Sequence, residues 1–206
     1  MIIKNIWKHL RKICIHKYWV GKYCFKVGLY WQGITHDLSK FNPIEFLESV
    51  KYYQGTHSPI EACKKENGYS KAWLHHRGRN LHHYQCWTDD FDDYYTEKGI
   101  TLIEMPYKYA VEMICDYLGA ARAYLGKDFS YKKEWQWWLG KRDNCAMHPQ
   151  TKFFIDDVLH ALANCKDDRT SEELLSEDFV KMMYNKRRTK LWPDLTKFFE
   201  EIYGRT

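Results

Sequence analysis

Several features are missing from this 206-residue sequence, and each absence excludes a class of protein. No apolar run approaches the ~20 residues that a transmembrane helix needs, so we expect neither a spanning segment nor a membrane partner. The basic stretch 1–14 lacks the continuous apolar core and the small-residue cleavage site of a secretory signal. No internal repeat or low-complexity segment is found, which excludes repeat arrays and a largely disordered chain.

Paired cysteines are also missing. The seven cysteines form no Cys-x-x-Cys pair, and their number is odd. This pattern argues against a zinc ribbon and against a disulfide framework. Reduced thiols in a cytoplasmic protein are the simplest interpretation.

The sequence is rich in apolar and aromatic side chains. Hydrophobic residues make up 45% of the chain and aromatic residues 17%, enough for one sizeable core in a single domain. The net charge of +5 suits an anionic small molecule, although solubility alone explains it equally well. Because the charge is modest and 89–93 is acidic, a nucleic-acid partner is not expected. The aromatic content is compatible with a homodimer.

Hydrophobic periodicity predicts an all-α fold of seven to nine helices, interrupted by a small extended excursion around 89–104. Gly28, Asn42 and Ser70 have the positions of helix caps, and Thr170 with Glu173 forms a capping-box pattern. Helices are expected over 3–27, from 43, from 70, over 106–125, 131–139 and 150–165, from 170 to 188, and from 193. Loops are expected at 31–33, 54–68 and 144–149.

The stretch His36-Asp37-Leu38-Ser39-Lys40 is the first candidate for a functional site. Imidazole and carboxylate groups are ligands for zinc, iron, manganese and nickel. A nearby ammonium can meet a phosphate oxygen as a point charge. If the stretch is helical, His36 and Lys40 lie one turn apart on one face. Taken alone, the His-Asp doublet favours a structural hydrogen-bonded pair over a metal site.

Four histidines within nine residues are the second unusual feature: His75, His76, His82 and His83. On one continuous helix His75 and His82 would be ~10 Å apart along the axis. They could then not share a metal ion, unless Gly78 breaks the helix. A solvated basic surface is the alternative to a ligand role.

Three further residues complete the candidates. His16 lies on the first predicted helix. Asp116 lies in the middle of a later helix beside Gly119 and other small residues, which permit another element to approach closely. A carboxylate at such a place is usually paired or metal-bound. Glu45 suits either a capping box or a catalytic role.

In chain order these candidates resemble the HD superfamily of metal-dependent phosphohydrolases, which are all-helical. Members of that superfamily carry a first His, a His-Asp doublet, further histidines and a distal Asp. The branch called HD-GYP also carries His-Asp-x-x-Lys, which 36–40 matches. The tripeptide Gly-Tyr-Pro is absent here, so the specificity of that branch for cyclic dinucleotides is not implied.

A closer resemblance covers about 5–165. It is to an uncharacterised family of bacterial and phage proteins with the motifs HDLSKF, AWLHH-x-x-x-N-x-HH and MP-x-KY-x-x-EM-x-CD. Here these are 36–41, 72–83 and 105–116. We therefore expect an HD-like domain over 1–165 and a helical extension over 166–206 that packs on it.

The resemblance implies a divalent transition metal as cofactor, as one or two ions of Mn, Fe, Zn, Ni or Co. The implied ligands are His16, His36, Asp37 and Asp116 for a first ion, with some of His75, His76, His82 and His83 for a second. Asp37, Lys40 and Arg79 would be catalytic, and Lys40, Arg79 and Asn80 would bind substrate.

Two functions follow as expectations. The first is a metal-dependent phosphohydrolase that attacks a nucleotide or other small phosphoester with a metal-activated water. The second is a non-catalytic HD-like protein that binds a metal or nucleotide and serves as a regulatory or phage-related accessory module.

Overall fold

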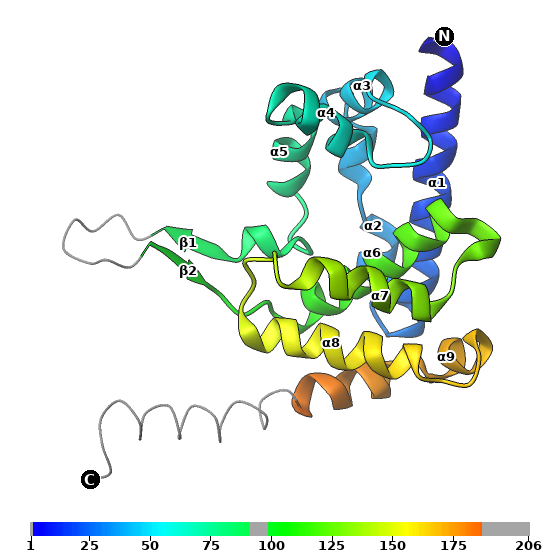
Figure 1. Ribbon diagram of the computed structural model, residues 1–206, viewed down its shortest axis with the longest axis vertical. Coiled ribbons are helices and arrows are strands. Elements are labelled where there is room, and N and C mark those ends of the chain that lie inside the picture. Colours follow the sequence, from blue (N-terminus) through cyan, green and yellow to red (C-terminus); the bar gives the residue numbers. More distant parts are fainter. Residues whose placement is uncertain (1, 91–98, 187–206) are drawn as a thin grey trace.

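Helices build almost the whole molecule, as the sequence predicts. A computed structural model describes residues 2–90 and 99–186 (Figure 1). The helices are α1 (Ile2–Lys26), α2 (Tyr30–Thr35), α3 (Pro43–Lys51), α4 (Pro59–Asn67), α5 (Lys71–Arg77), α6 (Tyr107–Leu125), α7 (Tyr131–Arg142), α8 (Pro149–Ala163), α9 (Asp168–Leu174) and a further helix over 177–186. Short 3-10 turns are η1 (Leu38–Phe41), η2 (Tyr84–Cys86) and η3 (Gly126–Asp128).

The expected extended excursion is a β-hairpin that projects from the helical body (Figure 1). Strands β1 (Thr88–Asp90) and β2 (Ile100–Leu102) pair antiparallel, with Thr88 opposite Leu102. The prediction at this position is confirmed.

Helices α1 and α6 pack along each other through the core. Gly119 makes this possible, because a Cβ atom added there would lie 2.4 Å from Val20 Cγ2. Val20 and Leu118 are fully buried at this contact. The close approach lets His16 of α1 and Asp116 of α6 face the same interior space, as the small residues on α6 predict.

The described part of the C-terminal extension shares this core. Leu175, Phe179 and Val180 belong to the same buried cluster as Phe154 and Leu159 of α8. The described residues of the extension, up to 186, therefore pack on the same core. The helix expected from Pro193 lies outside the described residues.

Three predicted caps are confirmed. Gly28 ends α1 with φ +77°, the Asn42 side chain accepts from the backbone N–H of Ile44, and Ser70 caps α5 through Trp73. The cap of α9 is Asp167 rather than Thr170, and the chain is not helical at Leu175–Ser176, so the predicted 170–188 helix is two helices.

Two predicted loops are wrong. Residues 31–33 lie inside α2. A Cβ atom added to Gly33 would lie 3.0 Å from side-chain atoms of Cys24 and Phe25 in α1, so the two helices pack closely at this glycine. That tertiary contact overrides a loop-like sequence. Within 54–68 the helix α4 runs from Pro59 and ends at Gly68, with φ +79°. Among the described residues no helix is both long enough and apolar enough to cross a bilayer.

Candidate metal centre

The His-Asp doublet lies at a sharp turn rather than on one helix. His36 follows the last residue of α2, and Asp37 adopts a left-handed conformation with φ 54° and ψ 26° before η1 begins. A helix through 36–40, which would have put His36 and Lys40 on one face, therefore does not form. A non-glycine residue in this region is uncommon, and such residues concentrate at functional sites. The turn directs the Asp37 side chain into the interior, where it is 2% exposed.

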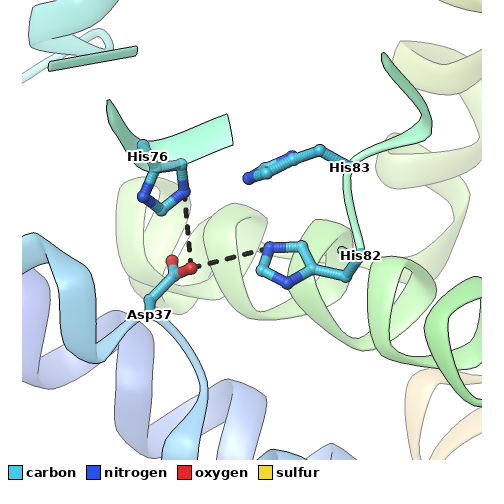
Figure 2. A group of neighbouring side chains, drawn as sticks. All are labelled: Asp37, His76, His82 and His83. Carbon is cyan, nitrogen blue, oxygen red and sulfur yellow. Dashed lines mark ion pairs between the residues drawn. The ribbon is translucent and has the colours of Figure 1, made fainter. Parts of the chain in front are cut away.

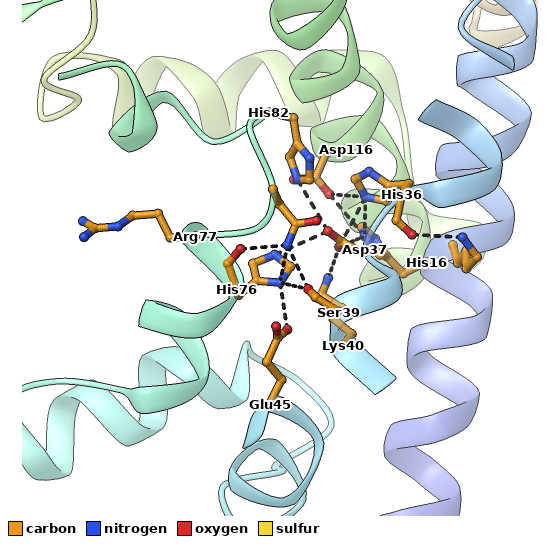
Figure 3. A network of polar contacts seen from close by, with 12 residues as sticks. His16, His36, Asp37, Ser39, Lys40, Glu45, His76, Arg77, His82 and Asp116 are labelled. Atoms are coloured by element: carbon orange, nitrogen blue, oxygen red, sulfur yellow. Dashed lines mark hydrogen bonds and ion pairs between the residues drawn. The ribbon is translucent and has the colours of Figure 1, made fainter. Parts of the chain in front are cut away.

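Four residues from three regions of the chain meet there and form what we call group A: His16, His36, Asp37 and Asp116 (Figure 3). His16 Nε2 lies 3.3 Å from Asp37 Oδ2 and 3.1 Å from Asp116 Oδ1. His36 Nε2 lies 3.3 Å from Asp37 Oδ2 and 3.4 Å from Asp116 Oδ1. The structure thus brings together all four residues that the resemblance implies for a first ion.

A second set on the other side of Asp37 is group B: Asp37, His76, His82 and His83 (Figure 2). Asp37 Oδ1 lies 3.4 Å from His76 Nε2 and 3.5 Å from His82 Nε2. The convergence depends on Gly78, which terminates α5, so that the chain turns back through 79–83. The alternative of a continuous helix is excluded.

Asp37 connects the two groups through its two oxygens. Its Oδ2 faces His16 and His36, and its Oδ1 faces His76 and His82. A carboxylate in this position can serve two cations at once. The other ligand atoms of the two groups are contributed by different segments, so Asp37 is their one shared member.

Glu112 orients two of the imidazoles, a role that the sequence did not reveal. Its Oε1 accepts from His36 Nδ1 (3.0 Å) and from His82 Nδ1 (3.2 Å). Each ring therefore directs its Nε2 atom towards Asp37. A carboxylate behind a metal-binding histidine fixes the tautomer and raises ligand basicity. The sequence signal that could have revealed Glu112 is its position four residues before Asp116, one helical turn away on α6.

Glu45 has the same role for His76. Its two oxygens accept from His76 Nδ1 (2.8 Å) and His75 Nδ1 (2.5 Å). His76 Nε2 is thereby left to face Asp37. The carboxylate of Glu45 is buried among these rings, so the capping-box interpretation is wrong. His75 belongs to neither ligand group, because its contact with Glu45 holds it behind His76.

Three buried polar atoms in group B have no hydrogen-bond partner among the described residues: Asp37 Oδ1, His82 Nε2 and His83 Nε2. Leaving such an atom unpaired costs about 1–3 kcal/mol each. All three atoms belong to one ligand group whose ligand atoms lie within 4.8 Å of one another. A cation at their centre would satisfy all of them, so the donor set fits a metal ion. The buried groups could hold such an ion, and nitrogen donors suit a transition metal.

The electrostatics of group A are those of paired charges. Burial opposes ionisation of Asp37, but His36 and Lys40 hold the pKa of its carboxyl well below the ordinary value. Burial likewise opposes ionisation of Asp116, and hydrogen bonds from His16 and His36 hold its pKa low. Burial lowers the pKa of His36, yet Asp37 and Asp116 raise it well above the usual range. Both carboxylates are thus ionised and available as ligands.

A cavity of about 230 Å³ opens onto both groups. His16 and Asp116 line it from group A, and His76 and His83 from group B. Lys40 also lines it, with its Nζ 2.5 Å from Asp37 Oδ2. The structure therefore places Lys40 beside the ligands and in reach of a molecule in the cavity.

Arg79 and Asn80 lie elsewhere. Arg79 is exposed and lines a separate pocket with Leu38 and His75. Asn80 donates to Ser39 Oγ (2.8 Å) and to the backbone oxygen of His76 (2.7 Å), so it fixes the turn after α5. The resemblance implies that both residues bind substrate, and for both residues that role stays a prediction.

Comparison with known proteins places the sequence motifs in context. A family model described as a family of unknown function, DUF5662, matches residues 5–161. The chain belongs to this family. The match includes every member of groups A and B as well as Glu45 and Glu112. No curated protein and no solved structure matches the chain.

Proposed function

We propose that this protein is a metal-dependent phosphohydrolase that acts on a nucleotide or another small phosphoester. The observation that carries the proposal is the sharing of Asp37 between two buried ligand groups, one of which holds three unpaired polar atoms. The order of the ligands along the chain, which resembles that of the HD superfamily, supports the same function.

The proposed cofactor is a pair of divalent transition-metal ions. Group A would hold one ion through His16, His36, Asp37 and Asp116, and group B the other through Asp37, His76, His82 and His83. When bound, such ions supply Lewis acidity and lower the pKa of water towards ~7. Three or four protein ligands leave room for water and substrate, as catalytic sites do.

The side chains around the cavity would bind the substrate, stabilise developing charge and orient the metal ligands. Lys40 carries a positive charge at the cavity, and the nearby carboxylates of Asp37 and Asp116 raise its pKa, although burial opposes this. Its ammonium would bind a phosphoryl oxygen and stabilise charge that develops in the reaction. Glu112 and Glu45 would keep the imidazoles oriented throughout. The enclosed cavity would exclude bulk water and strengthen these interactions.

The test is a hydrolysis assay with protein loaded with Mn²⁺, Ni²⁺, Co²⁺ or Mg²⁺. Substrates would be 4-nitrophenyl phosphate, bis(4-nitrophenyl) phosphate and nucleoside phosphates. We expect turnover with at least one transition metal, and its loss in Asp37→Asn. Absence of turnover with every metal, in protein that binds the ion, would instead favour the non-catalytic metal-binding or accessory role.

A further inference from the structure

The side of α1 that faces away from the metal centre carries an apolar stripe exposed to solvent. Its members are Ile3, Trp7, Cys14, Tyr18 and Phe25. At 100° per residue these five fall within an arc of about 60° on the helix. Ile3 is 73% exposed and Trp7 68%. A monomeric soluble protein rarely exposes contiguous apolar surface of this kind without a binding role.

Helix α2 continues the stripe. Tyr30 packs edge-on against Phe25, with ring centroids 5.3 Å apart. Ile34 lines a groove together with Tyr18 and Phe25, at the point where Gly33 lets the two helices meet. Trp31, in the same short helix, is 72% exposed. Helices α1 and α2 lie next to each other (Figure 1), so the exposed apolar residues form a surface that spans both elements.

The charge around the stripe has one sign. α1 contains seven Lys and Arg residues and no acidic residue. Four of these lysines bind inward: Lys12 to the backbone of Ala123, Lys17 to that of Ile34, and Lys22 and Lys26 to Glu172.

The remaining three cations, Lys4, Lys8 and Arg11, stand exposed beside Ile3 and Trp7. The described part of the chain gives none of them a carboxylate partner. They lie along one side of the apolar stripe and give it unneutralised positive charge.

We infer that this face of α1 and α2 binds the surface of an anionic lipid bilayer. Helices that lie in a membrane interface combine Trp and other apolar residues on one side with Lys and Arg beside them. Basic residues are attracted to anionic headgroups, and Trp and Tyr favour the interfacial depth. Such a helix needs only one apolar stripe, so the absence of a spanning segment does not bear on it.

The charge and the apolar surface together disfavour two other binding partners, a second copy of the chain and a nucleic acid. A second copy of the chain would bring two helices without acidic residues against each other. A nucleic acid would neutralise the lysines but leave Ile3, Trp7 and Phe25 in water. A bilayer with anionic headgroups matches both the charge and the apolar surface, and α1 can present this face while His16 on its opposite side stays in the metal centre.

Vesicle co-sedimentation of the full chain tests the inference. Vesicles of equimolar phosphatidylcholine and phosphatidylglycerol are compared with pure phosphatidylcholine. We expect binding to the anionic vesicles only, weakening as salt rises. Trp7→Ser, and separately the combined Lys4→Gln, Lys8→Gln and Arg11→Gln, should each reduce partitioning about tenfold. Ile100→Ser serves as control, since Ile100 is 65% exposed on the hairpin.

Three outcomes would overturn the inference. The first is absence of wild-type binding to anionic vesicles. The second is binding that Trp7→Ser leaves unchanged, which would indicate charge alone. The third is a concentration-dependent dimer in sedimentation velocity that Trp7→Ser abolishes, which would mean that a second copy covers the stripe. Circular dichroism of each variant excludes misfolding as the cause.

Discussion

Groups A and B share Asp37, but their polar atoms are satisfied in different ways. Group A balances two carboxylates against two imidazoles, and each imidazole contacts both carboxylates and the other imidazole at 3.1–3.4 Å. Group B sets one carboxylate oxygen against three imidazoles. Three of its buried atoms have no hydrogen-bond partner in the described chain, although Asp37 Oδ1 lies 3.4–3.5 Å from the Nε2 atoms of His76 and His82. Group A can be held by its own ion pairs, whereas a cation in group B would compensate the buried polar atoms that lack hydrogen bonds.

The comparison teaches that a buried polar cluster is not in itself evidence for a metal. Group A alone would also be explained as a network of ion pairs. Group B carries the stronger argument, because its unpaired atoms converge where no protein group satisfies them. The predictions below test whether the two groups depend on metal to different degrees, from the largest expected effect to the smallest.

The largest effect is expected from Asp37→Asn, which removes the ligand common to both groups while keeping its shape. Metal content measured by mass spectrometry should fall from up to two ions per chain to nearly none. Hydrolysis should fall by about a thousandfold or more, because the ligand framework is lost. The control is Asp143→Asn, an exposed carboxylate far from the centre. Retention of both ions by Asp37→Asn would refute the sharing of this residue.

A smaller and separable effect is expected from single histidine variants. His83→Ala should lose the ion of group B and keep that of group A, and His16→Ala the reverse. The stoichiometry should drop by about one ion in each, with activity reduced by about a hundredfold. His160→Ala is the matched control, because the His160 ring lies tilted against Trp135 and belongs to neither ligand group. Loss of both ions in either variant would show that the two groups are not independent.

The orienting carboxylates should have a weaker effect, again divided between the groups. Glu112→Gln disturbs His36 in group A and His82 in group B, so both ions should bind about 10–100-fold more weakly. Glu45→Gln disturbs only His76 and should weaken group B alone. Metal titration by calorimetry measures the binding of the first and of the second ion as separate steps. Equal effects of Glu45→Gln on both steps would contradict this division.

The smallest effect concerns a buried carboxyl outside both groups. Burial raises the pKa of Glu134 to about 8, which Lys141 only partly offsets. Its folded pKa thus exceeds the unfolded value near 4.5, and the folded chain holds a proton that the unfolded chain releases between these pH values. Stability should therefore fall as pH rises from 5 to 8, by at most about 1.4 kcal/mol per pH unit.

Glu134→Gln should remove this slope. Chemical denaturation of the metal-free protein at several pH values measures it. Asp37, whose carboxyl is paired with imidazoles, has a pKa shifted the opposite way, so its contribution is lost only in acid. An unchanged slope in Glu134→Gln would mean that this carboxyl is ionised in the folded protein.

Much of the fold and part of the site could be predicted from sequence. Periodicity and caps located the long helices, and α1 and α6 placed His16 and Asp116 where the pattern required. Local signals failed at α2, whose Gly33 is helical because it packs on α1. They also left open whether the helix that begins near Ser70 ends at Gly78, and it is the end of α5 there that lets His76 and His82 approach the same oxygen of Asp37.

Glu112 shows why the remainder of the site was not predicted. A Glu on an amphipathic helix has the same local sequence whether it is solvated or buried. Its role arises because α2 and the turn after α5 bring His36 and His82, separated by 46 positions in the chain, to the same carboxylate oxygen. That coincidence is a property of the tertiary fold. Glu45 was located by its position after Asn42, but its partners on α5 likewise became known only from the fold.

The most direct test of the central claim is anomalous diffraction from crystals of the protein grown with Mn²⁺, with data collected on both sides of the manganese edge. Two anomalous peaks are expected, one among His16, His36 and Asp116 and the other among His76, His82 and His83, with an oxygen of Asp37 on each. A cluster without anomalous signal, in crystals whose Mn²⁺ concentration saturates other sites, would contradict a shared two-ion centre.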